Sequence, residues 1–336
     1  MKALVLEDIR QLTLLEVPVP VPGSEDVLIQ TRASTICTSD LNDIDHNPFH
    51  TPLPVIIGHE GAGVIAGLGK NVQGFSVGDE VAAHPVMPCR VCPSCRRGLY
   101  HLCDNMEHLG LTRGGTFAEY FTVRADRIRK KTPALTFAQA SLMEPVCVCL
   151  EAIERAEVCE GGNVLVVGDG PFGVMIAKLC AAKRPKRIVL VGRHEYRLSQ
   201  VPEAICINEG RSADVDTEIM AETGGEGIDS AILAVGTTRA MDICMKALRS
   251  RGTVCVFSAI LGKAPVDLFK LHIKELNIHG SCNDMDCLDE AMRLLNDKKL
   301  NLASMITHEF PFDQWADAFA MAENGKDRAL KVSVTL

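Results

Sequence analysis

Hydrophobic and polar residues follow two different patterns along the chain, and the pattern changes near residue 149. From residue 1 to about 148, short segments alternate between apolar and polar residues, as in Val27–Thr31 and Gly63–Gly67, and Pro and Gly separate them. Alternation with a period of two is typical of half-buried β-strands, and Pro and Gly mark turns. We therefore predict an irregular, barrel-like β domain for this part of the chain.

After residue 148, predicted strands and helices follow one another. A continuous apolar run predicts a buried strand at 163–167, and further strands are expected at 187–192, 204–207, 228–235, 252–258 and 276–280. Helical spacing occurs at 150–160, 174–180 and 241–249. Strands separated by helices predict a parallel sheet with crossover connections, so we expect a doubly wound Rossmann domain of class α/β over residues 149–283.

The last segment of the chain has a pattern of its own. Residues 286–297 and 312–323 have the spacing of amphipathic helices, and 330–334 that of a closing strand. We expect this tail to return to the first domain, so that 1–148 and 284–336 form one domain and 149–283 the other. A length of 336 residues also favours two domains over one.

Composition narrows the class of protein. Hydrophobic residues make up 47% and charged residues 23%, and no apolar run reaches the length of about 18 residues that a membrane span needs. The first residues predict a strand and not a signal peptide, so we expect a soluble, cytoplasmic protein without a membrane partner. A net charge of −8 argues against a nucleic-acid partner, because phosphate binding requires clustered Lys and Arg.

A polar loop in the first domain contains four closely spaced cysteines. Cys89, Cys92, Cys95 and Cys103 have the spacing C-x2-C-x2-C-x7-C. Four thiolates this close suit a tetrahedral structural zinc, which would fold a loop too polar to fold by itself. The alternatives are four unrelated reduced cysteines and a zinc ribbon that binds nucleic acid. The acidic balance of the chain disfavours the second alternative.

A glycine-rich turn joins the predicted strand 163–167 to the predicted helix 174–180. It reads Gly168-Asp169-Gly170-Pro171-Phe172-Gly173, which is G-x-G-x-x-G between a strand and a helix. In this context the glycines allow a tight turn and let a pyrophosphate approach the helix N-terminus, whose N–H groups and dipole favour an anion. We predict a dinucleotide site here, with Gly168, Gly170, Pro171, Phe172 and Gly173 in contact with the cofactor.

A histidine beside a carboxylate lies between glycines in Gly58-His59-Glu60-Gly61-Ala62-Gly63. Such a pair suggests a metal or catalytic centre only if partner ligands exist elsewhere. Cys37-Thr38-Ser39-Asp40 lies upstream and Glu144-Pro145 downstream, so thiolate, imidazole and carboxylate ligands are all available. The alternatives are a simple turn at His59 and a helix cap at Ser39 and Asp40.

Taken together, these motifs resemble those of the zinc-dependent medium-chain dehydrogenases, nearest to their polyol, threonine and secondary-alcohol branch. The resemblance covers nearly the whole chain. It also includes Gly78-Asp79-Glu80-Val81 and Gly114-Gly115-Thr116-Phe117-Ala118-Glu119-Tyr120. It implies a GroES-like catalytic domain beside the Rossmann domain, two zinc ions per chain, a homodimer or homotetramer, and hydride transfer between a secondary alcohol and NAD(P).

The resemblance also implies roles for individual residues. Residues matching Cys37 and His59 bind the catalytic zinc in the family, while those matching Glu60 and Glu144 supply a ligand directly or through water. Ser39 matches the hydroxyl that relays the alcohol proton, and Asp40 matches the acid that orients the liganding histidine. Three protein ligands and an open position make a Lewis acid that can hold an alcohol oxygen.

The chain departs from the family pattern at three places. Asn42 stands where many relatives have a relay histidine, so water or His46 would have to replace it, and Glu151 stands where relatives often have a histidine. At the end of the second Rossmann strand, an NAD site requires a carboxylate, but this chain has Gly192-Arg193-His194. Arg193, together with Arg197, can pair with a 2′-phosphate, which predicts a preference for NADP(H).

The sequence indicates the substrate class less directly than it indicates the cofactor and the metal ligands. We expect the pocket to be lined near Thr38, Phe49, the loop 84–87, Val235 and Ala259, with Val235 also beside the cofactor. Aromatic residues make up only 4%, which leaves no obvious wall for a bulky aromatic alcohol. We predict a reversible dehydrogenase acting on a secondary alcohol that is a polyol or sugar derivative. The alternative is a non-catalytic NAD(P)-binding protein, structural or regulatory, on the same scaffold.

Overall fold

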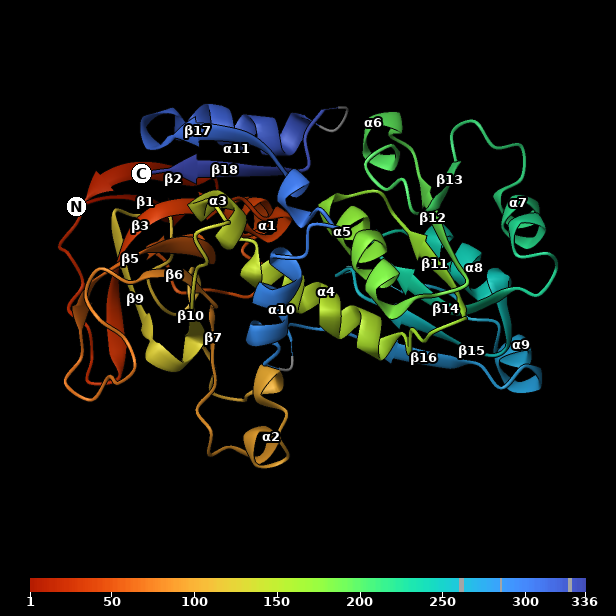
Figure 1. Cartoon of the computed structure of the whole chain (residues 1–336), viewed down its shortest axis with the longest axis horizontal. Helices are drawn as coiled ribbons and strands as arrows, with labels where there is room; N and C mark the ends of the chain where they lie inside the picture. Colours follow the sequence, from red (N-terminus) through yellow and green to blue (C-terminus); the bar gives the residue numbers. More distant parts are fainter. Residues whose placement is uncertain (260–262, 285, 326–327) are drawn as a thin grey trace. The chain divides into compact units, whose positions relative to one another are not determined.

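The computed structural model describes residues 1–259, 263–284, 286–325 and 328–336. The chain forms two compact units, of residues 1–147 with 285–336 and of residues 148–284. Figure 1 shows their elements along the sequence. We refer to them as the first unit and the nucleotide unit.

The first unit is built on a mainly antiparallel seven-stranded sheet. Its strands follow the order β10–β6–β5–β3–β18–β17, and β9 also pairs with β3. Their bounds are β3 Asp26–Thr35, β5 Glu60–Leu68, β6 Glu80–Ala83, β9 Tyr120–Arg124, β10 Ile128–Lys130, β17 Ile306–Pro311 and β18 Lys331–Thr335. Strand β18 pairs antiparallel with β3, so the end of the chain lies beside the strand that leads into the Cys37 motif.

Smaller elements complete this unit. Strands β2 (Gln11–Glu16), β1 (Lys2–Asp8) and β4 (Val55–Ile56) form a three-stranded sheet, and β7 (Val86–Met87) pairs with β8 (Glu107–His108). The helices are α1 Thr38–His46, α2 Pro93–Arg96, α3 Phe137–Ala140, α10 Leu288–Leu295 and α11 Trp315–Asn324. Short 3₁₀ turns are η1 Tyr100–Leu102, η2 Ala125–Arg127, η4 Leu302–Met305 and η5 Phe312–Gln314.

Alternation explains how the first sheet is buried. Val27 and Ile29 of β3 are fully buried and pack with Ile65 of β5 and Phe121 of β9. Strands β3 and β5 approach closely at Gly63, where an added Cβ would lie 2.1 Å from a backbone oxygen of β3. Only glycine fits there, which explains the small residues of the motif that follows His59.

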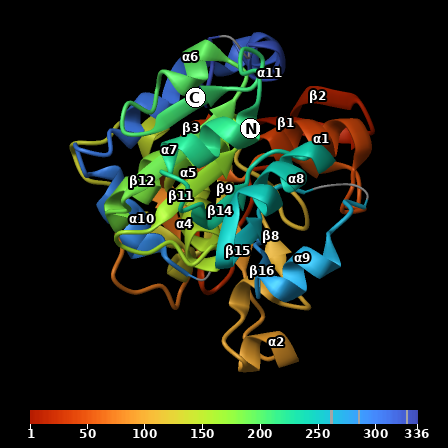
Figure 2. The ribbon, with the colours of Figure 1, turned by 90° about the vertical axis from the view of Figure 1, so that its right-hand side faces the viewer.

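The nucleotide unit contains a six-stranded parallel sheet in the order β13–β12–β11–β14–β15–β16. Figure 2 labels β12, β11, β14, β15 and β16 of this sheet. The strands are β11 Asn163–Val167, β12 Arg187–Gly192, β13 Ile205–Asn208, β14 Ile228–Leu233, β15 Leu248–Val256 and β16 Asn277–Gly280. Numbered from β11, this is the order 3-2-1-4-5-6 of a doubly wound dinucleotide-binding sheet. The order reverses at β11, so the ligand crevice of such a sheet is expected at the carboxyl end of this strand.

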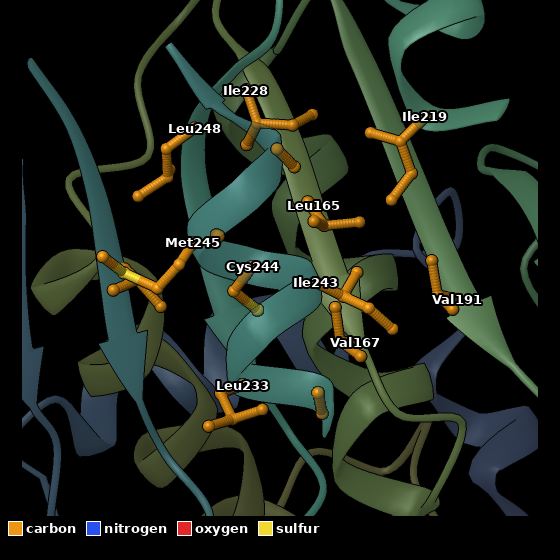
Figure 3. Packing of buried hydrophobic residues seen from close by; sticks show 14 of the residues in the cluster. Leu165, Val167, Val191, Ile219, Ile228, Leu233, Ile243, Cys244, Met245 and Leu248 are labelled. Carbon is orange, nitrogen blue, oxygen red and sulfur yellow. The ribbon is translucent and has the colours of Figure 1, made fainter. Parts of the chain in front are cut away.

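Helices connect these strands. They are α5 Pro171–Cys180, α6 Glu195–Leu198, α7 Val215–Glu222, α8 Thr238–Ala247 and α9 Leu268–Ile273, with η3 at Ala181–Lys183. Helix α8 contributes Ile243, Cys244 and Met245 to a hydrophobic cluster that also contains Leu165 and Val167 of β11 (Figure 3). Burial of these apolar residues removes them from water and holds the crossover helices on the sheet.

The structure corrects several predicted boundaries. The helix expected at 150–160 is α4, Met143–Arg155, so Glu144 lies in its first turn and Pro145 is tolerated there. Residues 248 and 249 belong to strand β15 and not to the helix expected at 241–249. Helix α6 is a single turn ending at Leu198, and α10 begins at Leu288. No helix among the described residues is long and apolar enough to cross a membrane.

Candidate active site and metal-binding residues

The turn from β3 into α1 holds Cys37 and Asp40 together. Cys37 is the N-cap residue of α1, and its N–H donates to Oδ2 of Asp40 at 2.8 Å. The other oxygen, Oδ1, lies 3.1 Å from Nδ1 of His59. Asp40 therefore caps the helix and also orients the histidine, so the two interpretations of this residue are compatible.

Three potential ligands converge at this turn. The ligand atoms of Cys37, His59 and Glu60 all lie within 4.8 Å of one another, and all three residues are buried. Ser39 Oγ lies 3.4 Å from His59 Nε2, on the side of the ring opposite Asp40. Burial lowers the pKa of His59, but the Asp40 carboxylate and the Cys37 thiolate outweigh it and raise that pKa well above its usual value. The electrostatics of this cluster thus favour a bound cation.

Glu60 is held by two residues that the sequence did not reveal. Its Oε1 accepts from Lys331 Nζ at 2.5 Å, and Thr35 Oγ1 donates to its Oε2. Side-chain exposure is 3% for Lys331 and 0% for Glu60. Burial lowers the pKa of Lys331, but the Glu60 carboxylate raises it to about 12. Both oxygens of Glu60 therefore already have partners, so this carboxylate is less available as a direct ligand.

Glu144 is not one of the three converging residues, but it has the character of a ligand. It is buried in α4, and its Oε2 has no hydrogen-bond partner among the described residues. Burial, together with the nearby Glu60 carboxylate, raises the pKa of Glu144 to about 7. A buried carboxylate oxygen without a partner needs a proton or a cation, so Glu144 fits the expected ligand set.

A second histidine, which the sequence did not single out, lies beside His59. The ring of His108 in β8 is 5.8 Å from that of His59, centroid to centroid. Its Nδ1 lies 2.7 Å from the Leu109 carbonyl, which can only accept, so Nδ1 carries the proton. Burial and His59 lower the pKa of His108 to about 3. A lone histidine in a polar segment gives no signal in the sequence.

Asn42, at the position of the relay histidine, and His46, its proposed replacement, both belong to α1. Asn42 and His46 are both exposed, and neither is one of the three converging residues. Phe49, expected in the pocket, is 66% exposed, whereas His84 and Met87 are buried.

The four cysteines of the polar loop converge. The sulfur atoms of Cys89, Cys92, Cys95 and Cys103 all lie within 4.8 Å of one another. Cys89 and Cys95 are 4.0 Å apart and Cys92 and Cys103 are 3.9 Å apart. A zinc ion bound at about 2.3 Å to each sulfur requires separations of about 3.8 Å. Backbone N–H groups of Val91 and Cys92 lower the pKa of Cys89 to about 6, so the loop also favours the thiolate that a metal needs.

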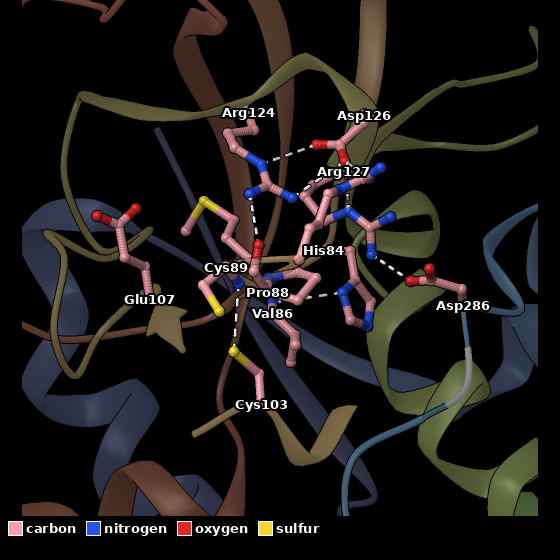
Figure 4. A network of polar contacts seen from close by, with 12 residues as sticks. His84, Val86, Pro88, Cys89, Cys103, Glu107, Arg124, Asp126, Arg127 and Asp286 are labelled. Atoms are coloured by element: carbon pink, nitrogen blue, oxygen red, sulfur yellow. Dashed lines mark hydrogen bonds and ion pairs between the residues drawn. The ribbon is translucent and has the colours of Figure 1, made fainter. Parts of the chain in front are cut away.

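A polar network holds the base of this loop (Figure 4). Arg124 donates from Nη1 to the carbonyl of Pro88 at 2.8 Å and pairs with Asp126. The neighbouring Arg127 is buried and pairs with Asp286 of the C-terminal segment. These contacts fix the backbone that enters Cys89.

The glycine fingerprint has the geometry of a dinucleotide turn. Gly168 follows β11 with φ +118°, and a Cβ on Gly173 would lie 1.9 Å from the Gly168 oxygen. At Gly170, the N-cap of α5, an added Cβ would meet nothing within 4 Å. Pro171 and the partly buried Phe172 open the helix. The N-terminus of α5 is thus left open to an approaching anion, which fits a pyrophosphate.

The end of β12 lies next to this fingerprint. The Asp169 carboxylate accepts from the N–H groups of Arg193 and His194 at 2.8 and 2.6 Å. The Arg193 side chain is 64% exposed and pairs with Glu209, whereas Arg197 is buried. Gly192 is buried and its Cα faces Asp169, and Val235 is half-buried after β14.

Comparison with known proteins identifies the family. Residues 23–133 match the model of the alcohol dehydrogenase GroES-like domain, and residues 170–297 match that of the zinc-binding dehydrogenases. The chain belongs to the zinc-dependent medium-chain dehydrogenases. It is 32% identical to the L-threonine 3-dehydrogenase of Pyrococcus horikoshii, over 93% of this chain and 92% of that protein.

Two further relatives support this assignment. The L-galactonate-5-dehydrogenase of Escherichia coli is 28% identical over 95% of this chain and 94% of that protein. An Escherichia coli structure described as a short chain alcohol dehydrogenase complexed with NADH is 26% identical, with a TM-score of 0.92 over 100% of this chain and 99% of that one.

The family confirms the predicted class of enzyme. The chain is an NAD(P)-dependent alcohol dehydrogenase with a GroES-like domain and a Rossmann domain. The alternative of a non-catalytic protein is therefore set aside.

Replacing Lys331 by Met should lower the free energy of unfolding by about 3–5 kcal/mol, because Glu60 would keep a buried charge without its cation. Urea unfolding followed by circular dichroism measures this change. Glu60→Gln in the same background should recover part of the loss, since it removes the charge. The matched control is Lys246→Met, whose exposed pair with Asp242 is worth about 0–1 kcal/mol. Equal effects of the two lysine variants would contradict the assignment.

Proposed function

We propose that this enzyme reversibly oxidises a secondary alcohol, a polyol or sugar derivative, to the ketone at a zinc site formed by Cys37, His59 and Glu144. The observation that carries the proposal is the convergence of Cys37 and His59 beside Glu60, with Ser39 and Asp40 attached to the same histidine. The buried Glu144 oxygen that has no hydrogen-bond partner among the described residues supports the third ligand. The names of two relatives place their reactions at carbon 3 of threonine and carbon 5 of galactonate, which supports an internal carbon.

Each residue of the proposed site has a distinct task. Cys37, His59 and Glu144 would hold the zinc, and Asp40 fixes the tautomer and orientation of His59 by accepting from its Nδ1–H. Glu60, anchored by Lys331, adds negative charge beside the metal ligands and acts as a ligand only if it leaves the lysine. Ser39 is partly exposed at the edge of the cluster, so its hydroxyl can accept the proton of the alcohol and pass it outward.

Zinc and nicotinamide, when bound, supply a Lewis acid that favours ionisation of the alcohol and an acceptor for its hydride. The chain itself supplies the placement of both reactants. In the nucleotide unit, Gly168 and Gly173 allow the backbone of the turn to pack closely, and Gly170 leaves room for the pyrophosphate at the start of α5. In the first unit, Cys37, His59 and Glu144 are buried, so a metal held by them would be shielded from bulk water.

We also propose a second, structural zinc at Cys89, Cys92, Cys95 and Cys103. Sulfur separations of 3.9 and 4.0 Å support it, since they need little change to form a tetrahedron. Such thiolates persist in a reducing compartment, which supports a cytoplasmic location.

For the cofactor, we propose a preference for NADP(H). Arg193 follows β12 at the place where an NAD site carries a carboxylate, and its side chain is exposed. An exposed guanidinium attracts a 2′-phosphate. It has no acceptor atom, so it cannot accept the hydrogen bond that a ribose 2′-hydroxyl donates to a carboxylate in an NAD site.

Elemental analysis of protein purified without added metal should find two zinc ions per chain, falling to one in Cys37→Ser. The variant should retain its circular dichroism spectrum and lose oxidation of a panel of polyols and secondary alcohols by at least about a thousandfold, because the ligand set is incomplete. Cys149→Ser, at another buried cysteine, is the control and should retain both ions. One zinc in the native protein, unchanged in Cys37→Ser, would overturn the catalytic zinc.

Fluorescence titration with the two reduced cofactors tests the proposed preference. NADPH should bind at least about tenfold more tightly than NADH, because only NADPH carries the phosphate that Arg193 can pair with. The preference should shrink as salt is added, since the pair is exposed. Equal affinities at low salt would contradict it.

We propose that the chain assembles as a homodimer or homotetramer through the nucleotide unit. Leu268, Phe269 and Ile273 of α9 are 71%, 72% and 58% exposed, which is unusual for a monomer. Light scattering coupled to size exclusion should give a mass of two or four chains. Leu268→Glu combined with Phe269→Glu should reduce this mass, and a monomeric native protein would refute the proposal.

A further inference from the structure

Two arginines of the nucleotide unit share a single carboxylate. Arg193 Nε lies 2.8 Å from one oxygen of Glu209, and Arg239 Nε lies 2.5 Å from the other. The two arginine side chains are 64% and 66% exposed, whereas that of Glu209 is 15% exposed. The carboxylate therefore sits between two accessible guanidinium groups and cancels only one of their two charges.

The three residues come from three different strand ends. Arg193 follows β12, Glu209 follows β13, and Arg239 lies in the first turn of α8, which follows β14. In a parallel sheet the carboxyl ends of the strands lie at one edge, and here that edge carries the glycine fingerprint after β11. The cluster thus lies on the edge that receives the nucleotide.

The backbone of this cluster is fixed from the fingerprint side. Asp169, between the first two fingerprint glycines, accepts from the N–H groups of Arg193 and His194 and contacts His194 Nδ1 at 3.0 Å. A single carboxylate therefore ties the pyrophosphate turn to the segment that carries Arg193. Arg197, which the sequence suggested as the second cation, is buried, and Arg239 is the accessible one.

We infer that Arg193 and Arg239 together bind the 2′-phosphate of NADP(H), and that Glu209 holds both guanidinium groups in place until the phosphate displaces it. The inference rests on the proposed cofactor preference and names the residues that produce it. Both arginine side chains are largely exposed, so solvent screens their pairs with Glu209, whereas a phosphate dianion can accept from both arginines at once. Glu209 then has a second effect, because it competes with the phosphate for the same two cations.

The test uses binding and not turnover. Isothermal titration calorimetry of the whole enzyme compares adenosine 2′,5′-bisphosphate with 5′-AMP, and the difference in affinity measures the contribution of the 2′-phosphate. Titrations with NADPH and NADH make the same comparison for the whole cofactors. Arg239→Ala should weaken binding of the bisphosphate and of NADPH at least about tenfold and change 5′-AMP and NADH less than twofold. Glu209→Gln should tighten the bisphosphate and NADPH and leave 5′-AMP and NADH unchanged.

The matched control is Arg211→Ala. Arg211 is an exposed arginine that follows the same strand β13, but it pairs with Glu195 and not with Glu209. This variant should bind all four ligands like the native enzyme. An equal loss of bisphosphate binding in Arg211→Ala and Arg239→Ala would indicate general charge attraction and overturn the specific pair.

The remaining outcomes separate the two proposals. A native enzyme without any preference for NADPH overturns both the preference and the arginine pair. A preference that survives Arg239→Ala overturns the pair alone. Weaker binding of NADH or 5′-AMP by Glu209→Gln would identify Glu209 as the acceptor of the ribose hydroxyl and overturn its role as a competitor. Weaker binding of NADPH by this variant would also overturn that role.

Discussion

The buried ion pair between Glu60 and Lys331 connects the beginning of the metal motif to the last strand of the chain. Its partners are 271 residues apart, and Lys331 Nζ also donates to the carbonyl of Ile36, immediately before Cys37. A buried charge is costly unless it is paired, so Glu60 can only be tolerated when β18 has docked beside β3. The metal-ligand turn therefore depends on the C-terminal strand, which explains why the chain returns to its first unit after the nucleotide unit.

The same pair belongs to a cluster with an excess of carboxylates. Asp40, Asp43, Glu60 and Glu144 are all buried in the first unit, and Lys331 is the buried lysine that lies among them. Burial and Asp40 raise the pKa of Asp43 to about 7, and burial raises that of Glu144 to a similar value. Burial is the main cause of both shifts, and a neighbouring carboxylate adds to each, Asp40 for Asp43 and Glu60 for Glu144. A divalent cation bound by Cys37 and His59 would stabilise the ionised form of these buried carboxylates.

The sequence predicted those features that a local pattern determines. The strand at 163–167 was right because a continuous apolar run leaves few alternatives, and the four cysteines converged because their spacing already limits the loop to a small chelate. The start of α4 was missed because Glu144-Pro145 has the local chemistry of a loop, and only tertiary packing continues the helix through it.

Lys331 was missed for a similar reason. A lysine in a strand looks solvent-exposed until its partner Glu60, far away in the sequence, is placed opposite it. Arg239 likewise has the local chemistry of a solvated helix start, and its significance depends on Glu209.

Helix α4 begins at Met143 in the first unit and ends at Arg155 in the nucleotide unit, so the boundary at residue 147 falls within regular secondary structure. Many proteins of two units have an irregular linker at such a boundary, and exchange of units between homologous genes is simplest there. In this chain, a crossover at the boundary would join half-helices from two parents, and any insertion or deletion would rotate Glu144 by about 100° per residue relative to the rest of the helix. A crossover at this boundary therefore preserves the helical register of Glu144 only if it adds or removes no residue within α4.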